Sequence, residues 1–248
     1  MKLRYLLKLG IILCLCVLIY CLFQLYHIYD DYQLIEANTE AIRETASAEL
    51  FDENDPIYRK IDLDALLAIN PDVKGWLYIP DTQIDEPVLL GPSNDTYLYT
   101  DMYGSYSKAG SLFLDEMNQG NFQDDVSIIY GHNMANGSRF HDLRYYLEQD
   151  FYEAHPYIYL YLPDGSVCLY QVFASATINA ASELYTTDVD DLISYHQQIA
   201  SRASIYTTSS LELSSPTLLL STCTSRNHDD RNVVFAMCIR KENPLEHQ

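Results

Sequence analysis

A cysteine that ends an apolar, strand-like run is the first feature of this chain that could do chemistry. Cys223 closes the run TLLLSTC, and a polar loop then leads to an arginine, Arg231. A buried cysteine packs as a small hydrophobe and does not require such surroundings. A reactive cysteine does, because the attacking species is the thiolate, which forms where partly exposed, electropositive surroundings stabilise its charge. Cys223 is therefore the candidate nucleophile for acyl transfer.

A nucleophilic cysteine requires a proton partner, usually a histidine. Among the seven histidines, His132 directly follows VSIIYG, a buried-type strand that ends at Gly131. A rigid element would therefore present His132 to a cleft, and His141, in SRFHDL, is its nearest rival. The other histidines are expected near the membrane, at the surface or in the tail: His27, His155, His196, His228 and His247.

Donors for the tetrahedral oxyanion are the third requirement of acyl transfer. Arg231 opens the last strand, RNVVFAMCIR, beside the loop that begins at Cys223. Its guanidinium would offer a planar fork of donors that stays charged at any working pH. An ion pair with Asp229 or Asp230 is the alternative interpretation of this arginine. Arg226, in the middle of the loop, is expected to be solvated.

The other cysteines form neither a disulfide framework nor a zinc site. Cys168 and Cys238 lie within strand-like runs and are expected in the core. Three more lie in the apolar amino-terminal segment: Cys14, Cys16 and Cys21. The remaining cysteines have no short spacings, CxxC pairs that would bind zinc are absent, and no acidic cluster resembles a calcium site. The spacing of the cysteines therefore predicts no zinc site.

Short strands and an inserted helix are the elements that must position these residues. From Gly75 onward, short apolar or alternating runs are separated by turn residues, a pattern typical of an antiparallel sandwich or barrel. The expected strands are WLYIP, EPVLL, SLFLD, VSIIYG, YIYLYLPDG, VCLYQVFASATI, TLLLSTC and NVVFAMCIR. Asp188–Ser204 has an acidic start, spaced apolar residues and a basic residue near its end, which predict a helix between two strands. A short helix is also predicted at Asp62–Ile69, before an Asn-Pro pair.

The amino terminus has the features of a membrane anchor. An apolar run from Leu9 to about Tyr26 approaches the ~20 residues that span a bilayer. Basic residues precede the run and acids follow it, so the positive-inside rule places the amino terminus in the cytoplasm and the rest of the chain outside the cell. The flanking charges belong to Lys2, Arg4, Lys8, Asp30 and Asp31. A cleaved signal peptide is the alternative, but the small residues Ala46-Ser-Ala48 lie well beyond the run.

We expect four segments along the chain. Residues 1–30 form a cytoplasmic tip and the transmembrane anchor, and residues 31–60 form a juxtamembrane spacer that is helical and charged over 32–56. Residues 61–241 form one catalytic domain, and residues 242–248 form a tail. The hydrophobic fraction of 48% is too high for a disordered chain.

The charge balance argues against nucleic acids as partners. The chain has 15 Lys and Arg against 35 Asp and Glu, which gives a formal net charge of −20. Nucleic-acid binding depends on basic patches that contact phosphates. We therefore expect no nucleic-acid partner and no polybasic face that would bind a membrane surface.

Together these residues resemble a class B sortase. LSTC (Leu220–Cys223) matches most of the family's TLxTC signature, Arg231 matches the family's arginine, and IIYGHNM (Ile128–Met134) matches its histidine strand. The resemblance runs from about Ile61 to Arg240. One position departs from it: Leu219 stands where the family usually has threonine. Because this is a strand residue, we expect altered packing rather than altered chemistry.

The resemblance implies a membrane-anchored transpeptidase on a closed eight-stranded β-barrel, with amino-terminal helices and a helix inserted before the strand that carries the nucleophile. Cys223 would attack a backbone carbonyl in the carboxyl-terminal sorting signal of a secreted protein and form a thioester. His132 would protonate the leaving amine, and Arg231 would hold the substrate carbonyl and stabilise the oxyanion. An amine of a peptidoglycan precursor would then resolve the thioester, and the resemblance implies that no metal or cofactor is needed. Four residues are candidates for contacts with the signal: Ser221, Thr222, Leu98 and Tyr185.

Other functions are compatible with parts of this pattern. A pilus-polymerising sortase would use the same chemistry with a pilin lysine as the accepting amine. An L,D-transpeptidase would carry SHGC around its nucleophile, from which LSTC departs. A non-catalytic, membrane-anchored interaction domain would require the joint presence of Cys223, His132 and Arg231 to be coincidental.

Overall fold

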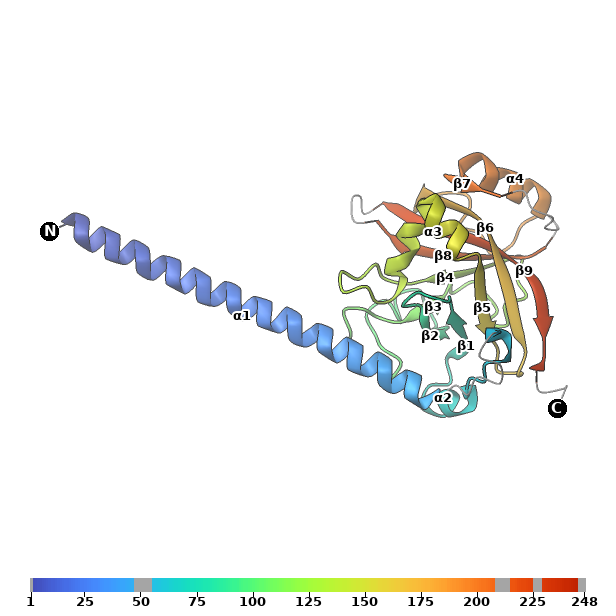
Figure 1. The fold of residues 1–248 in the computed structure, drawn as a ribbon, viewed down its shortest axis with the longest axis horizontal. Helices are drawn as coiled ribbons and strands as arrows, with labels where there is room; N and C mark the ends of the chain where they lie inside the picture. The colour runs from blue at the N-terminus through green and yellow to red at the C-terminus, as the bar shows by residue number, and fades with distance from the viewer. Residues whose placement is uncertain (1, 47–54, 208–214, 225–228, 245–248) are drawn as a thin grey trace. The chain divides into compact units, whose positions relative to one another are not determined.

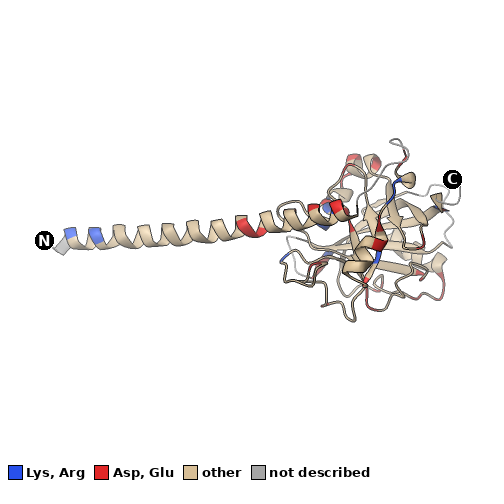
Figure 2. Cartoon of the chain, turned by 90° about the horizontal axis from the view of Figure 1, so that it is seen from below, with Lys and Arg blue, Asp and Glu red and all other residues tan. Residues whose placement is uncertain are grey.

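The computed structural model describes residues 2–46, 55–207, 215–224 and 229–244. The chain divides into two compact units, residues 1–40 and 41–248. Helix α1 (Lys2–Thr45) supplies the whole described part of the first unit, and its apolar stretch is long enough and apolar enough to cross a membrane. Figure 2 shows basic residues at its start, a long uncharged stretch and then acidic residues, which is the charge order expected from the sequence.

The second unit is built on a closed β-barrel (Figure 1). Eight strands follow each other in the order β5-β1-β2-β3-β4-β8-β9-β6, and pairing between β5 and β6 closes the ring. The strands are β1 (Val73–Tyr78), β2 (Asp85–Leu89), β3 (Leu112–Leu114), β4 (Val126–Tyr130), β5 (Tyr157–Tyr161), β6 (Val167–Asn179), β8 (Thr217–Cys223) and β9 (Asp230–Glu242). A short strand, β7 (Ile205–Tyr206), pairs with β6 outside the ring. The predicted eight-stranded barrel is confirmed.

The barrel is mixed rather than antiparallel, which corrects the expectation drawn from the strand pattern. The pairs β2–β3 and β4–β8 are parallel. Parallel neighbours require a long crossover, and here residues 90–111 and 131–216 provide it. Short strands with turns do not reveal which strands are neighbours, so the sequence pattern could not show this. As a consequence, β4 and β8 end at the same rim of the barrel.

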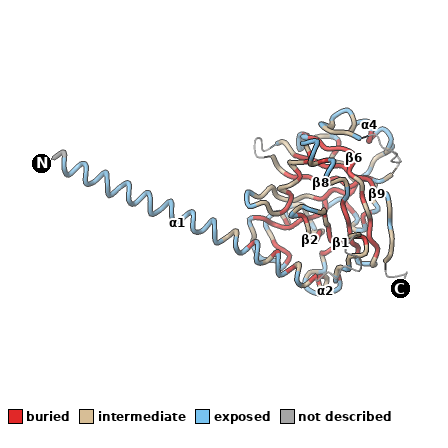
Figure 3. Tube along the Cα trace, in the orientation of Figure 1, coloured by how far each residue is buried: buried red, intermediate tan, exposed pale blue. Residues whose placement is uncertain are grey.

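Alternation along the strands separates an inner face from an outer face. On β8, Leu218 and Leu220 point into the barrel and pack with residues such as Val234. Leu219 points outward and packs with Phe235 in a second cluster that also contains residues of α4. Figure 3 shows that buried residues follow the barrel strands. Leu219 is fully buried, so the unusual residue of the signature is a packing residue, as expected.

The helices around the barrel have caps that define their ends. Helix α2 (Leu63–Ile69) begins after Asp62, which accepts a hydrogen bond from the Ala65 amide at 3.0 Å. These bounds agree with the helix predicted at Asp62–Ile69. Helix α4 (Leu192–Arg202) is shorter than predicted because Asp191 caps it and the earlier acids precede the cap. Three helical elements escaped prediction: η1 (Pro56–Tyr58), η2 (Phe140–Leu147) and α3 (Gln149–Ala154).

Two other expectations need correction or restriction. His196 is not at the surface: it is fully buried on α4, and its Nε2 lies 2.7 Å from Thr217 Oγ1, because the helix turns this side toward the barrel. Helix α1 continues to Thr45, but residues 47–54 of the predicted spacer lie outside the described residues. Cys168 is buried as expected, and Cys238 is half-buried against the same cluster.

Candidate active site

Cys223 lies between His132 and Arg231 at the rim where β4 and β8 end. The parallel register pairs Tyr130 with Ser221, and the Gly131 amide donates to the Ser221 carbonyl at 3.2 Å, so His132 follows on one side of Cys223. On the other side, antiparallel pairing sets Cys223 directly opposite Arg231. Directly opposite residues share a face of the sheet. The three residues predicted to do chemistry therefore meet on one side of the barrel wall.

These residues line one cavity of about 190 Å³, which we call the thiol cavity. Its wall includes Leu98, Phe113, Tyr130, His132, Cys223 and Arg231. Three of the four predicted signal-contacting residues line it: Leu98, Ser221 and Thr222. His141 does not: it lies in η2, with its ring against Tyr145 at 6.0 Å. Arg226 and His228 lie outside the described residues.

Gly131 allows His132 to approach the barrel end closely. A Cβ at this position would meet Leu112 Cδ2 at 2.5 Å and Phe140 Cδ2 at 2.8 Å, so a side chain would push the loop outward. The Phe140 amide also donates to the His132 carbonyl at 2.9 Å. The backbone that carries His132 is therefore fixed from both ends.

The His132 ring is oriented by a carbonyl. His132 Nε2 lies 2.7 Å from the Leu98 carbonyl oxygen, and because a carbonyl only accepts, Nε2 carries a hydrogen and Nδ1 is left to exchange a proton. Burial lowers the pKa of His132 below its usual 6.5; the hydrogen bond to Leu98 opposes this shift, and the nearby positive charge of Arg139 adds to it. The imidazole is therefore neutral at neutral pH and able to accept a proton.

Asn133 connects the loop that carries His132 to β8, and the sequence analysis did not predict this contact. Its Nδ2 donates to the Cys223 carbonyl oxygen at 3.2 Å. This contact holds the end of β8 against the residue that follows His132. Its only signal in the sequence is its place next to the candidate histidine.

Tyr185 reaches the thiol cavity through Ser221. The Tyr185 hydroxyl and Ser221 Oγ share a hydrogen bond of 2.7 Å, and the Tyr185 ring stacks on Tyr130 with centroids 6.3 Å apart. Burial raises the pKa of Tyr185 to about 12, so its hydroxyl stays neutral. Tyr130 is anchored by donating to Asp115 Oδ2 at 3.0 Å. The two tyrosines form a rigid, uncharged wall on the outer face of β8.

Arg231 contacts the backbone of its predicted acidic neighbour. Its Nη1 donates to the Asp230 carbonyl oxygen at 3.1 Å, so this contact with Asp230 is made through the main chain. A guanidinium carries five N–H donors in a fixed fork. Its position opposite Cys223 is suited to holding a carbonyl oxygen beside the thiol.

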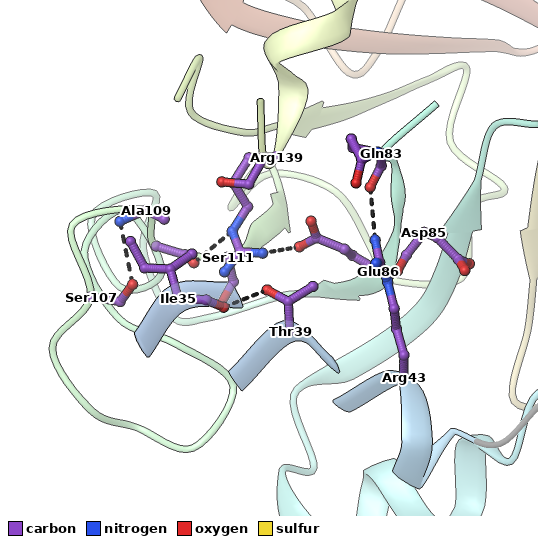
Figure 4. A network of polar contacts seen from close by, with 12 residues as sticks. Ile35, Thr39, Arg43, Gln83, Asp85, Glu86, Ser107, Ala109, Ser111 and Arg139 are labelled. Carbon is purple, nitrogen blue, oxygen red and sulfur yellow. Dashed lines mark hydrogen bonds and ion pairs between the residues drawn. The ribbon is translucent and has the colours of Figure 1, made fainter. Parts of the chain in front are cut away.

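Figure 4 shows a buried ion pair between Arg139 and Glu86. This pair supports the loop that packs on the Leu98 carbonyl, which orients His132. The Arg139 guanidinium pairs with Glu86, with side chains each only 5% exposed, and its Nε donates to the Gly110 carbonyl at 3.0 Å. Gly110 has a φ of +54°, and a Cβ there would lie 2.4 Å from the Leu98 oxygen, so this loop packs directly on Leu98. Arg139 itself adopts a φ of +59°, which is rare for a residue with a side chain. Glu86 and Arg139 are far apart in the sequence, so no local pattern predicted that they form an ion pair.

The arrangement contains the parts needed for nucleophilic acyl transfer. A thiol, a neutral imidazole and a guanidinium face one cavity with an apolar and aromatic wall. In the part of the chain that the structure describes, no group of three or more His, Cys, Asp or Glu side chains could hold a metal ion.

Comparisons with known proteins extend over most of the chain. The sortase domain matches residues 77–239. Sortase B of Listeria monocytogenes is 36% identical over 185 residues, which cover 70% of this chain and 72% of that protein. A structure of a Streptococcus pyogenes class B sortase involved in pilus biogenesis is 30% identical, has a TM-score of 0.65, and the match covers 71% of this chain and 96% of that one. A structure of a sortase B complexed with triglycine is 26% identical, has a TM-score of 0.73, and the match covers 84% and 98% of the two chains.

Proposed function

We propose, from the membership of this chain in the sortase family as a class B cysteine transpeptidase, that it cleaves the carboxyl-terminal sorting signal of secreted proteins. The cleaved protein is then transferred to an amine of a peptidoglycan precursor. The observation that carries this proposal is the meeting of Cys223, His132 and Arg231 at one cavity. The relative complexed with triglycine supports a peptide amine as the acceptor.

The first half of the proposed reaction forms a thioester. Neutral His132 accepts the thiol proton, and the Cys223 sulfur attacks the scissile carbonyl carbon, so a C–S bond forms and the oxygen becomes negative. Arg231 stabilises this oxyanion through its N–H donors. When the intermediate collapses, the C–N bond breaks and His132 gives its proton to the leaving amine.

The second half resolves the thioester. The acceptor amine attacks the thioester carbon, a new C–N bond forms, and the C–S bond breaks to release the Cys223 thiolate. His132 takes the proton that the amine loses and returns it to the sulfur. Water can replace the amine, and the product is then a free carboxylate.

The proposed location follows from the first unit. Helix α1 acts as a single-pass anchor, with its basic start in the cytoplasm and the catalytic domain outside the cell. The secreted substrates emerge on that same side of the membrane.

The test uses the full chain in detergent micelles and a peptide library. With a cleavable signal peptide, mass spectrometry should find an acyl group on Cys223, and a primary amine should convert this adduct to an amide. The Cys223→Ala variant should give neither product. An acyl group on another residue, or no adduct with any peptide, would contradict the proposal.

Pilus assembly is the second candidate because one related structure is described as involved in pilus biogenesis. The two acceptors can be compared directly on the same acyl-enzyme. A preference for a folded pilin lysine over a glycine peptide would favour polymerisation, and the reverse preference would favour wall anchoring.

A further inference from the structure

We propose that Tyr99 is a positioning residue for the proposed transpeptidase reaction, on which this inference rests: its ring packs on the His132 imidazole, restricts the plane of that ring and keeps water from one side of it. The two ring centroids lie 5.3 Å apart, and the planes are inclined by 37°. This distance is within the range of favourable contacts between aromatic rings. Tyr99 directly follows Leu98, whose carbonyl already orients the same histidine.

The hydrogen bond to Leu98 does not by itself fix the plane of the imidazole. His132 Nε2 lies 2.7 Å from the Leu98 carbonyl oxygen, which sets the position of this one ring atom. The χ2 torsion of a histidine is broad and roughly two-fold, so the ring can still turn about the Cβ–Cγ bond. The Tyr99 ring restricts this rotation because it packs on the imidazole. Leu98 and Tyr99 together therefore hold Nδ1, the nitrogen that exchanges protons in the proposed reaction.

The backbone around Tyr99 is held by hydrogen bonds within the loop between β2 and β3. The Ser107 amide donates to the Tyr99 carbonyl oxygen at 3.0 Å, and Ser111 Oγ donates to the Thr100 carbonyl oxygen at 3.0 Å. These bonds join the two arms of the loop on either side of the Tyr99 peptide. The loop therefore presents the Tyr99 ring to His132 from a fixed main chain.

Tyr99 lies beside His132 but outside the thiol cavity. Its side chain is 50% exposed, and it is not among the residues that line the cavity. Part of the ring therefore covers the imidazole while the rest contacts solvent. A residue in this place acts on the reaction through His132, and it can be replaced without removing a wall of the cavity.

This cover also bears on the charge state of His132. Burial lowers the pKa of His132, the hydrogen bond to Leu98 opposes this shift, and the positive charge of Arg139 adds to it. The other charged or titratable groups that share a cavity with the imidazole are Asp95, Tyr130, Cys223 and Arg231. All of these groups remain when Tyr99 is made smaller, whereas water gains access to the imidazole. The pKa of His132 should then rise toward its usual 6.5.

The experiment compares three variants of the full chain in detergent micelles. Tyr99→Ala removes the ring, and Tyr99→Phe keeps the ring but removes the hydroxyl. The matched control, Tyr106→Ala, removes a ring that is 74% exposed on the same loop. Tyr106 pairs with Thr100 in an antiparallel bridge, so its side chain lies on the opposite face from that of Tyr99. Both tyrosines lie in a loop and are at least half-exposed, so none of the variants removes a core residue.

Two measurements are made, and the first needs no substrate. NMR titration should give a higher pKa for His132 in Tyr99→Ala than in the unmodified chain, and an unchanged pKa in Tyr99→Phe and Tyr106→Ala. The second measurement is the rate of acyl-adduct formation on Cys223 with a cleavable signal peptide, at a pH well above 6.5 where His132 is neutral in every variant. This rate should fall about tenfold in Tyr99→Ala alone, which is part of the ~10²–10⁴-fold that general acid–base catalysis contributes.

An unchanged pKa of His132 or an unchanged acylation rate in Tyr99→Ala would overturn the role of Tyr99. An equal loss of rate in Tyr99→Phe or in Tyr106→Ala would do the same, because the hydroxyl or the loop in general would then be responsible. Absence of the acyl adduct in the unmodified enzyme would instead refute the proposed function, and the titration would still test the contact between Tyr99 and His132.

Discussion

Replacing Arg139 by methionine should destabilise the folded domain by about 3–5 kcal/mol, because it leaves the Glu86 carboxylate buried without its countercharge. Glu86 is 4% exposed, Arg139 contacts its Oε2, and its Oε1 has no hydrogen-bond partner among the described residues. The Arg139 guanidinium is therefore the main group that compensates the buried charge of Glu86. With a urea dependence of about 3 kcal/mol per molar, the unfolding midpoint should fall by roughly 1–1.7 M.

Unfolding of the full chain in micelles can be followed by the fluorescence of Trp76, the single tryptophan. Trp76 is fully buried on β1, next to the strand of Glu86, and its indole donates to Asp85 Oδ1 at 2.7 Å. As a control, Arg202→Met breaks a 3.7 Å ion pair with Glu183 at the surface and should cost only about 0–1 kcal/mol.

A double variant separates the contribution of this ion pair to stability from its contribution to positioning His132. The double variant Glu86→Leu with Arg139→Met removes both charges and should regain most of the lost stability, since apolar replacement of a buried ion pair is often neutral or stabilising. It still lacks the donor to Gly110, so Leu98 and the ring of His132 should stay less well held and kcat should remain low. A loss below about 1 kcal/mol in Arg139→Met, or full kcat in the double variant, would refute this reasoning.

Three other predictions concern the thiol cavity. Arg231→Lys keeps the charge but loses the planar fork, so kcat/KM for the signal peptide should fall on the order of 10²-fold. The control, Arg202→Lys, should leave kcat/KM nearly unchanged. An unimpaired Arg231→Lys enzyme would contradict the oxyanion role. NMR titration should give His132 a pKa below 6.5. The unfolded chain then binds a proton at a higher pH than the folded chain does, so the stability of the folded state should decline as the pH falls below about 6.5. A titration midpoint above 6.5 would contradict burial as the cause of the shift. Thiol-directed sulfonates should label Cys223 while Cys168 stays protected in the folded state. If mass mapping found Cys168 labelled first, the strand that carries Cys168 would not be packed as described.

The parts of the fold that could be predicted are those with local signals. Asp62 and an Asn-Pro pair define α2, and apolar runs such as TLLLSTC identify the strands. The position of His132 at the end of a buried strand and of Arg231 at the start of the last one also followed from the chain itself. These signals specify what an element is, and they depend on residues close together in sequence.

The missed features depend on contacts between distant segments. The parallel pairing of β4 with β8, the ion pair of Glu86 with Arg139 and the contact of Asn133 with Cys223 each join residues that are far apart in the chain. The burial of His196 depends likewise on which side of α4 packs on the barrel. A short apolar or charged pattern does not contain this information, because it is set by tertiary neighbours.

The parallel neighbours β4 and β8 also determine when this enzyme can first become active during its synthesis. Everything between these strands, residues 131–216, is made before β8, and β9 must follow to pair with both β8 and β6. A nascent chain that ends before residue 217 lacks Cys223 and Arg231 and leaves β4 and β6 with unpaired edges. Such high-separation contacts form slowly, and open edges bind other strands. An incomplete chain is therefore both unreactive toward passing substrates and prone to aggregation, so acylating activity should appear only after the last strand closes the barrel.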